Sequence, residues 1–200
     1  MPRSPLLRAP FATVLLGGVA LALAAPVLRA QGGAGGALLP GQARSGPVIA
    51  SAGQSFVVEN PTFAVPAGHV FKLLFEVNAG GGDSTTVNAQ LTTMARFYNL
   101  QVRNGVPKER LKAAAVVHGM GWTALLTDAA FAARFGGARN PSRALTQELL
   151  AAGAQLVLCG QTAGSRGIRR EELLPGVQVA TAAMTALSVL EADGYRLIPW

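Results

Sequence analysis

Short apolar runs alternate with segments of helical periodicity from residue 70 to the end of the chain. The first run, VFKLLFEV at 70–77, is almost continuously hydrophobic, as expected for a strand covered on both faces. Further strands are expected at 111–117, 154–158, 177–180 and 195–198. Strands that alternate with helices predict right-handed crossovers and a parallel sheet with helices on both faces, which is an α/β fold.

The helices between these strands are expected from apolar residues at three- and four-residue spacing and from their end signals. Asp83 or Ser84 is expected to cap the first helix. One helix is expected over 122–133, and Asn140, which precedes a proline, is expected to cap the next. Thr181 is expected to cap the last helix.

The N-terminus has the pattern of an export signal. Arg3 and Arg8 precede an apolar stretch over 11–25, and no acid occurs among them. This stretch is about fifteen residues, shorter than the roughly 20 that a spanning helix needs. We therefore expect a signal peptide over 1–30, cleaved after Ala30 or earlier, with an uncleaved anchor as the alternative. A periplasmic or secreted protein follows, with no membrane attachment after cleavage.

The rest of the chain divides by composition. Residues 31–46 are rich in Gly, Ala and Pro and are expected to form a flexible linker. Residues 47–69 hold short apolar pieces between prolines and are expected to form an extended arm packed on the domain, which spans 70–200. About 170 residues remain after cleavage, enough for one domain with a core of its own.

The charge does not favour nucleic-acid binding. The formal net charge is +7, and loss of Arg3, Arg8 and Arg29 with the signal removes three positive charges and leaves +4. Aromatic residues are 6% of the chain and do not alternate with basic residues, as they do in many nucleic-acid-binding surfaces.

Cys159 is the single cysteine of the chain. Exported proteins normally use cysteines in pairs, so an unpaired thiol at the end of an apolar strand needs an explanation. One reading is an inert residue of the core. The other is a reactive thiol, since Gly160 permits close backbone approach and the amides that follow can point at the sulfur.

The carboxyl ends of parallel strands form the working edge of such a sheet. Asn78, His118 and Cys159 follow or end three strands there, and Gly119 and Gln161 lie beside them. A free cysteine has a pKa of about 8.5, and a helix N-terminus or a protonated histidine lowers it. His118 is the histidine expected at this edge, and the Gln161 side chain is expected to donate to sulfur or substrate.

Other chemistries have less support in the sequence. Without a second cysteine, a covalent sulfur intermediate must be resolved by another molecule. A Cys-His-Asp hydrolase lacks an aspartate whose position marks it as the orienting residue. One cysteine and one histidine fall short of the usual metal ligand set, so neither a metal nor another cofactor is expected.

The stretch 46–200 resembles the DsrE/DsrF-like sulfur-relay family, in its exported bacterial branch. The matching pieces, in order, are VFKLLFEV at 70–77, MARFYN at 94–99, VVHG at 116–119, NP at 140–141, AG at 152–153, CGQ at 159–161, ELLPGV at 172–177, AAMT at 182–185 and GY at 194–195. The resemblance implies a three-layer α/β/α sandwich around a five-stranded, mostly parallel sheet. It also implies homo-oligomers, commonly trimers or hexamers, and a cysteine that carries sulfur as a persulfide.

Two functions follow as hypotheses. In the first, the protein is a sulfur carrier or thiol-handling protein that acts through Cys159, in the manner of a sulfurtransferase. Its partner is then a donor or acceptor protein or a small thiol, and its pocket is lined by Asn78, His118, Gly119, Gly160 and Gln161. In the second, the chain is a non-catalytic, oligomeric binding or assembly domain with a structural cysteine. A thiol-dependent metal or redox sensor is a third, weaker alternative.

Overall fold

A computed structural model describes residues 41–199. Five strands form one sheet in the order β4-β3-β2-β1-β5, and each of the four pairings in it is parallel. This confirms the predicted α/β class with a five-stranded sheet. The strands are β1 (Phe71–Val77), β2 (Leu111–Val117), β3 (Gln155–Cys159), β4 (Gln178–Ala180) and β5 (Arg196–Leu197).

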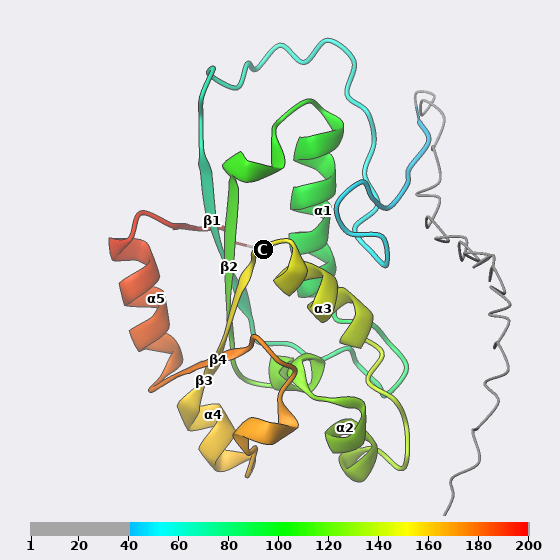
Figure 1. Ribbon diagram of the computed structural model, residues 1–200, viewed down its shortest axis with the longest axis vertical. Helices are drawn as coiled ribbons and strands as arrows, with labels where there is room; N and C mark the ends of the chain where they lie inside the picture. Colours follow the sequence, from blue (N-terminus) through cyan, green and yellow to red (C-terminus); the bar gives the residue numbers. More distant parts are fainter. Residues whose placement is uncertain (1–40, 200) are drawn as a thin grey trace, which may run out of the picture. The chain divides into compact units, whose positions relative to one another are not determined.

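Helices connect these strands (Figure 1). The α-helices are α1 (Ala89–Arg103), α2 (Asp128–Arg134), α3 (Arg143–Ala151), α4 (Gly160–Ser165) and α5 (Ala183–Ala192). Three short 3₁₀ helices accompany them: η1 (Lys108–Arg110), η2 (Gly121–Leu125) and η3 (Arg170–Glu172). No helix in the described part of the chain combines the length and the apolar character that a membrane crossing requires.

The sheet separates two layers of helix, because side chains alternate between its faces. On β2, Ala113, Ala115 and Val117 join one apolar cluster, and Ala114 and Val116 join another. The first cluster lies under α1, α2 and α3, whereas the second lies under α5, which contacts β1, β2 and β3. Figure 1 shows α1 and α3 on one side of the strands and α5 on the other, which is the three-layer arrangement.

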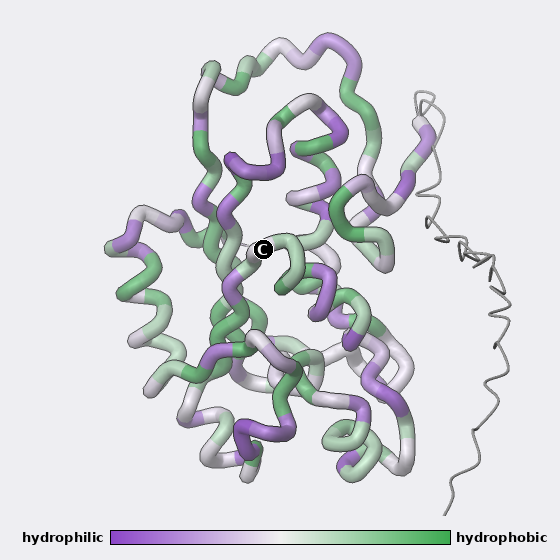
Figure 2. Tube along the Cα trace, in the orientation of Figure 1, coloured by the Kyte–Doolittle hydropathy of each residue, from purple (hydrophilic) through white to green (hydrophobic). Residues whose placement is uncertain are grey.

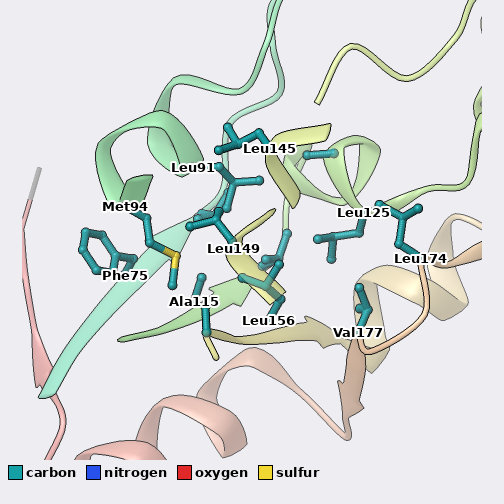
Figure 3. Packing of buried hydrophobic residues seen from close by; sticks show 14 of the residues in the cluster. Phe75, Leu91, Met94, Ala115, Leu125, Leu145, Leu149, Leu156, Leu174 and Val177 are labelled. Atoms are coloured by element: carbon teal, nitrogen blue, oxygen red, sulfur yellow. The ribbon is translucent and has the colours of Figure 1, made fainter. Parts of the chain in front are cut away.

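The larger cluster is a dense core (Figure 3). Leu91 and Met94 of α1 and Leu149 of α3 are fully buried and pack over Phe75 and Leu156 of the sheet. These helices are amphipathic and place their apolar residues on the sheet side. In Figure 2 the hydrophobic colour follows the strands and also much of α5, a helix whose composition is apolar around most of its circumference.

The direction of the crossovers locates the topological switch point of the sheet. The chain steps from β1 to β2, β3 and β4 in one direction, and α5 then returns it across the opposite face to β5, beside β1. The topological switch point of the sheet therefore lies between β1 and β5, where open α/β sheets commonly bind ligands.

Three predicted helix caps are wrong, and one predicted helix is divided. Helix α1 begins later than expected, because the Asp83 carboxylate accepts the amides of Thr85 and Thr86 in a local turn, and Asn88 supplies the cap. These hydrogen bonds lower the pKa of Asp83 to about 2.

The predicted helix over 122–133 is divided into η2 and α2, and Thr127 caps the second part. Asn140 does not cap α3, since its amide donates to the carbonyls of Ala124 and Leu126 and its oxygen accepts from Ser142. Thr181 does not cap α5, which follows Ala182 without a side-chain cap.

The segment before β1 packs on α1 through polar contacts. The fully buried Asn99 accepts the amides of Val48 and Ile49 and donates to the carbonyls of Ile49, Ala52 and Gly53. One amide side chain thus holds a whole turn of chain on the domain. The predicted signal peptide over 1–30 and most of the predicted linker lie outside the described residues.

Candidate functional site

Cys159 ends β3 and directly precedes α4. It pairs with Ala180 of β4, and the residue is 6% exposed. Leu158 belongs to the larger apolar cluster and Val157 to the smaller one, so alternation places the Cys159 side chain on the α5 side of the sheet. The thiol therefore lies at the carboxyl edge, on the face that a single helix covers.

The sulfur is surrounded by hydrogen-bond donors. Burial acts to raise the pKa of Cys159, but hydrogen bonds from the Thr162 amide and hydroxyl, from the Ala183 amide and from the Gln161 amide act against it. Together they outweigh burial, and the pKa of Cys159 lies below its ordinary value. The groups that favour the thiolate thus come from the first turn of α4 and, from a more distant part of the chain, from the first residue of α5.

The two turns around the sulfur are held tightly together. A Cβ atom at Gly160 would lie 2.5 Å from the Ala180 carbonyl oxygen and 3.0 Å from that of Thr181. The Gln161 side chain donates to the Thr181 carbonyl at 3.2 Å. The Gln161 side chain thus binds the neighbouring turn, and its backbone amide is the Gln161 group that acts on the thiol. Donation from this side chain to a substrate stays a prediction.

His118 follows β2, and its partner is a residue that the sequence did not single out. The imidazole Nε2 lies 2.8 Å from the Glu76 carboxylate oxygen Oε1, and both side chains are partly exposed. Glu76 was detectable, since it is the one acidic residue in a strand that is apolar apart from it and Lys72, and it lies one residue before the strand's carboxyl end.

The register brings His118 to the level of Cys159. Val117 pairs with Leu158, and the His118 amide extends the ladder by donating to the Val77 carbonyl at 2.9 Å. One step further along both strands, His118 and Cys159 are neighbours at the same edge. Within residues 41–199 no hydrogen bond joins the two side chains, and the imidazole is absent from the groups that lower the pKa of the thiol.

Asn78 and Gly119 shape the adjoining loop. The Asn78 amide donates to Gln90 Oε1 at 3.0 Å, and its side-chain oxygen accepts from Gln90 Nε2 at 3.3 Å. Gly119 has a φ of +53°, and a Cβ there would meet the Asn78 carbonyl oxygen at 2.5 Å. Gly119 is therefore required for the close approach of two loops, whereas Asn78 borders a cavity.

That cavity has a volume of about 280 Å³ and lies at the switch point between β1 and β5. Its lining consists of the polar residues Glu76, Asn78 and Gln90 and the segment Leu197, Ile198 and Pro199. A larger, mainly apolar cavity of about 410 Å³ is lined by the loop after β1 and by Met120, Thr123, Phe131 and Phe135. Among the residues that the structure describes, no group of three or more His, Cys, Asp or Glu side chains could hold a metal ion.

The chain matches the family model of the DsrE/DsrF-like family over residues 72–200. No curated protein matches the sequence. Among solved structures, it is similar to the protein MTH1491 from Methanobacterium thermoautotrophicum, described as a protein of unknown function, with 16% identity and a TM-score of 0.46 over 64% of this chain and 97% of the other. The family match covers well over half of the sequence, and the chain therefore belongs to the DsrE/DsrF-like family.

Proposed function

We propose that this protein is a sulfur carrier that holds a persulfide on Cys159 and passes the outer sulfur to a thiol acceptor. The observation that carries the proposal is the set of amide and hydroxyl donors on the sulfur, from α4 and from the first residue of α5. Such donors favour an anionic sulfur. Membership in the DsrE/DsrF-like family supports a role of the sulfur-relay kind.

Cys159 is a thiolate both before it accepts sulfur and after it has given sulfur to the acceptor. The Cys159 thiolate attacks the terminal sulfur of a polysulfide, the neighbouring sulfur–sulfur bond breaks, and a polysulfide shorter by one sulfur leaves with the electron pair. In the second step an acceptor thiolate attacks the outer sulfur of the persulfide, and Cys159 leaves as a thiolate. The same donors stabilise the sulfur of Cys159 before the first step and after the second.

Mass spectrometry of the intact protein tests this proposal. After incubation with polysulfide and removal of the excess, the protein should gain about 32 Da per sulfur atom on Cys159, and a thiol should remove that mass. Cys159→Ser is the control and should gain nothing. An unchanged mass in the folded wild-type protein would exclude a carrier role.

The second candidate function, an assembly domain, is favoured by the outer face of α5. Met184 is 77% exposed and Val189 is 55% exposed on a helix that carries few polar residues. We propose that this face contributes to a homo-oligomer, a trimer or hexamer, as the resemblance implies. Sedimentation velocity of the wild type and of a Met184→Glu, Val189→Glu double variant tests it, since the variant should dissociate while keeping its helical circular dichroism. A wild-type monomer would exclude the assembly role.

We further propose that the carrier works outside the cytoplasm. The support is the pattern of Arg3, Arg8 and the apolar stretch over 11–25. A fusion of residues 1–46 to a reporter enzyme that is active only after export should become active in a bacterial host. Changing Leu15 and Leu16 to Asp in the fusion should abolish that activity.

A further inference from the structure

The Glu76–His118 pair is a polar unit that the carrier proposal does not yet use. We infer that His118 exchanges the proton of the acceptor thiol during sulfur transfer, and that Glu76 is the positioning residue that orients its imidazole. This inference rests on the proposed function of Cys159. It assigns a role to Glu76, which was not among the predicted site residues.

Three side chains on consecutive strands face the same way. Glu76 alternates with Phe75 and Val77, which belong to the larger cluster, so it points toward the α5 side. Cys159 lies on that same side by the alternation along β3. The 2.8 Å contact with Glu76 places the His118 imidazole on this face as well. The thiol, the imidazole and the carboxylate therefore share one edge and one face of the sheet.

The contact with Glu76 decides which imidazole nitrogen is available. A carboxylate accepts hydrogen bonds, so Nε2 carries the hydrogen and Nδ1 of the neutral ring is left as the base. No hydrogen-bond partner of Nδ1 occurs among residues 41–199, and the His118 side chain is 28% exposed. A proton can therefore reach this nitrogen from a ligand or from solvent.

The cavity at the switch point gives a small acceptor a place beside Glu76. Its volume is about 280 Å³. Glu76, Asn78 and Gln90 form the polar part of its wall, and Leu197 and Ile198 form an apolar part. A low-molecular-weight thiol with an apolar stem and a polar end fits a lining of this kind. We therefore assign the acceptor to the class of small thiols.

The transfer step balances without an oxidant or a reductant. The acceptor thiol gives its proton to Nδ1 of His118, and the resulting thiolate attacks the outer sulfur of the Cys159 persulfide. The bond between the two persulfide sulfurs breaks, and its electron pair stays on Cys159. The products are Cys159 thiolate and the acceptor persulfide, and the proton passes from His118 to solvent.

A single-turnover assay separates this inference from the carrier proposal. The protein is loaded with polysulfide, freed of excess, and mixed with 2-mercaptoethanol, a thiol with a short apolar stem and a polar end. Mass spectrometry follows the loss of about 32 Da from Cys159. The variants are His118→Ala, Glu76→Gln and Glu76→Asp, and Glu191→Gln is the matched control, an exposed carboxylate on α5. Circular dichroism reports whether each variant is folded, and the amount of sulfur loaded reports on the first step.

All variants should load sulfur as the wild type does. Transfer should slow roughly 100-fold in His118→Ala, within the range for a lost general acid–base group, and added imidazole should recover part of the rate. Glu76→Gln should slow it roughly tenfold, since an amide no longer enforces one tautomer. Glu76→Asp should recover much of that loss, and Glu191→Gln should match the wild type.

Two results overturn the inference and leave the carrier role intact. One is that His118→Ala or Glu76→Gln transfers sulfur at the wild-type rate. The other is a slower Glu76→Gln protein whose transfer rate Glu76→Asp does not improve. A wild-type protein that gains no sulfur in the loading step instead removes the carrier proposal, and this inference with it.

Discussion

The two faces of the sheet are covered very differently. On one face α1, α2 and α3 bury a large apolar cluster, in which Leu91, Leu149 and Leu156 are inaccessible to solvent. On the other, α5 alone covers a small cluster around Val116 and Leu190. The first face is built as a core, whereas the second is a thin layer whose outer surface is itself apolar.

The candidate site lies on the thin face. Glu76, His118 and Cys159 occupy the carboxyl edge of that side, and the first residue of α5 donates its amide to the sulfur. A thin cover leaves polar side chains within reach of ligands, while the opposite core keeps the strands in register. The contrast teaches that stability and proposed chemistry are assigned to opposite faces of the same strands.

The largest expected effect tests this contrast with one substitution on each face. Leu149→Ala in α3 should lower the free energy of unfolding by about 4 kcal/mol, because the fully buried site has little room to collapse. Leu190→Ala in α5 should lower it by about 2 kcal/mol, since the thin layer can relax around the gap. Urea denaturation measures both values. Equal losses would show that α5 packs as firmly as α3.

The next effect concerns the tight turn at the sulfur. Gly160→Ala should lower the free energy of unfolding by about 2 kcal/mol, because its Cβ would lie 2.5 Å from the Ala180 carbonyl oxygen. Gly164→Ala, in the same short helix, meets nothing within 4 Å and should stabilise by about 0.5 kcal/mol. The same denaturation assay compares them. If both alanines are tolerated equally, the β4–α5 turn is not held against α4 as described.

A smaller effect concerns the charge state of the thiol. Thr162→Val removes the hydroxyl donor but keeps the backbone amide, so the pKa of Cys159 should rise toward its ordinary value. Thr162→Ser keeps a hydroxyl and should resemble the wild type. The rate of alkylation by iodoacetamide, measured against pH, gives the midpoint for each protein. A midpoint that Thr162→Val does not move would remove the hydroxyl from the groups that stabilise the thiolate.

The smallest effect is a pH dependence of stability. Because the pKa of Cys159 is lower in the folded than in the unfolded chain, the unfolded state binds more protons between the two values. Stability from this group is therefore present above the unfolded pKa and is lost as the pH falls through the folded one. The difference in unfolding free energy between wild type and Cys159→Ala should widen as the pH rises through that window. A constant difference would mean that the two pKa values are equal.

Much of the framework was predictable from local pattern. The strand run at 70–77 and the glycine after Cys159 are local signals, and the structure has β1 at Phe71–Val77 and a close backbone contact at Gly160. The helix caps were predicted less well. Asp83 and Asn140 are good cap residues by type, yet each binds backbone groups in a nearby loop, and only the folded chain shows which donors are within reach.

The site was predicted only in part for the same reason. The thiol and its adjacent amides follow one another in sequence, so their contact is a local property. The Ala183 amide reaches the site from α5 and the Glu76 carboxylate from β1, and such contacts depend on register and on the crossover of α5. The Gln161 side chain was expected to donate to sulfur or to substrate, and it donates to the Thr181 carbonyl, which the chain brings alongside only when β4 pairs with β3.

The sequence by itself determined the alternation of strands and helices, the parallel sheet and the position of Cys159 at a strand end. These depend on hydrophobic periodicity and on backbone preferences, which act over a few residues. Only the tertiary structure decided which face the thiol occupies, that Glu76 is the partner of His118, and that two separate turns donate to one sulfur. Those facts depend on strand order and register, because hydrogen bonds between distant residues form only after the strands are side by side.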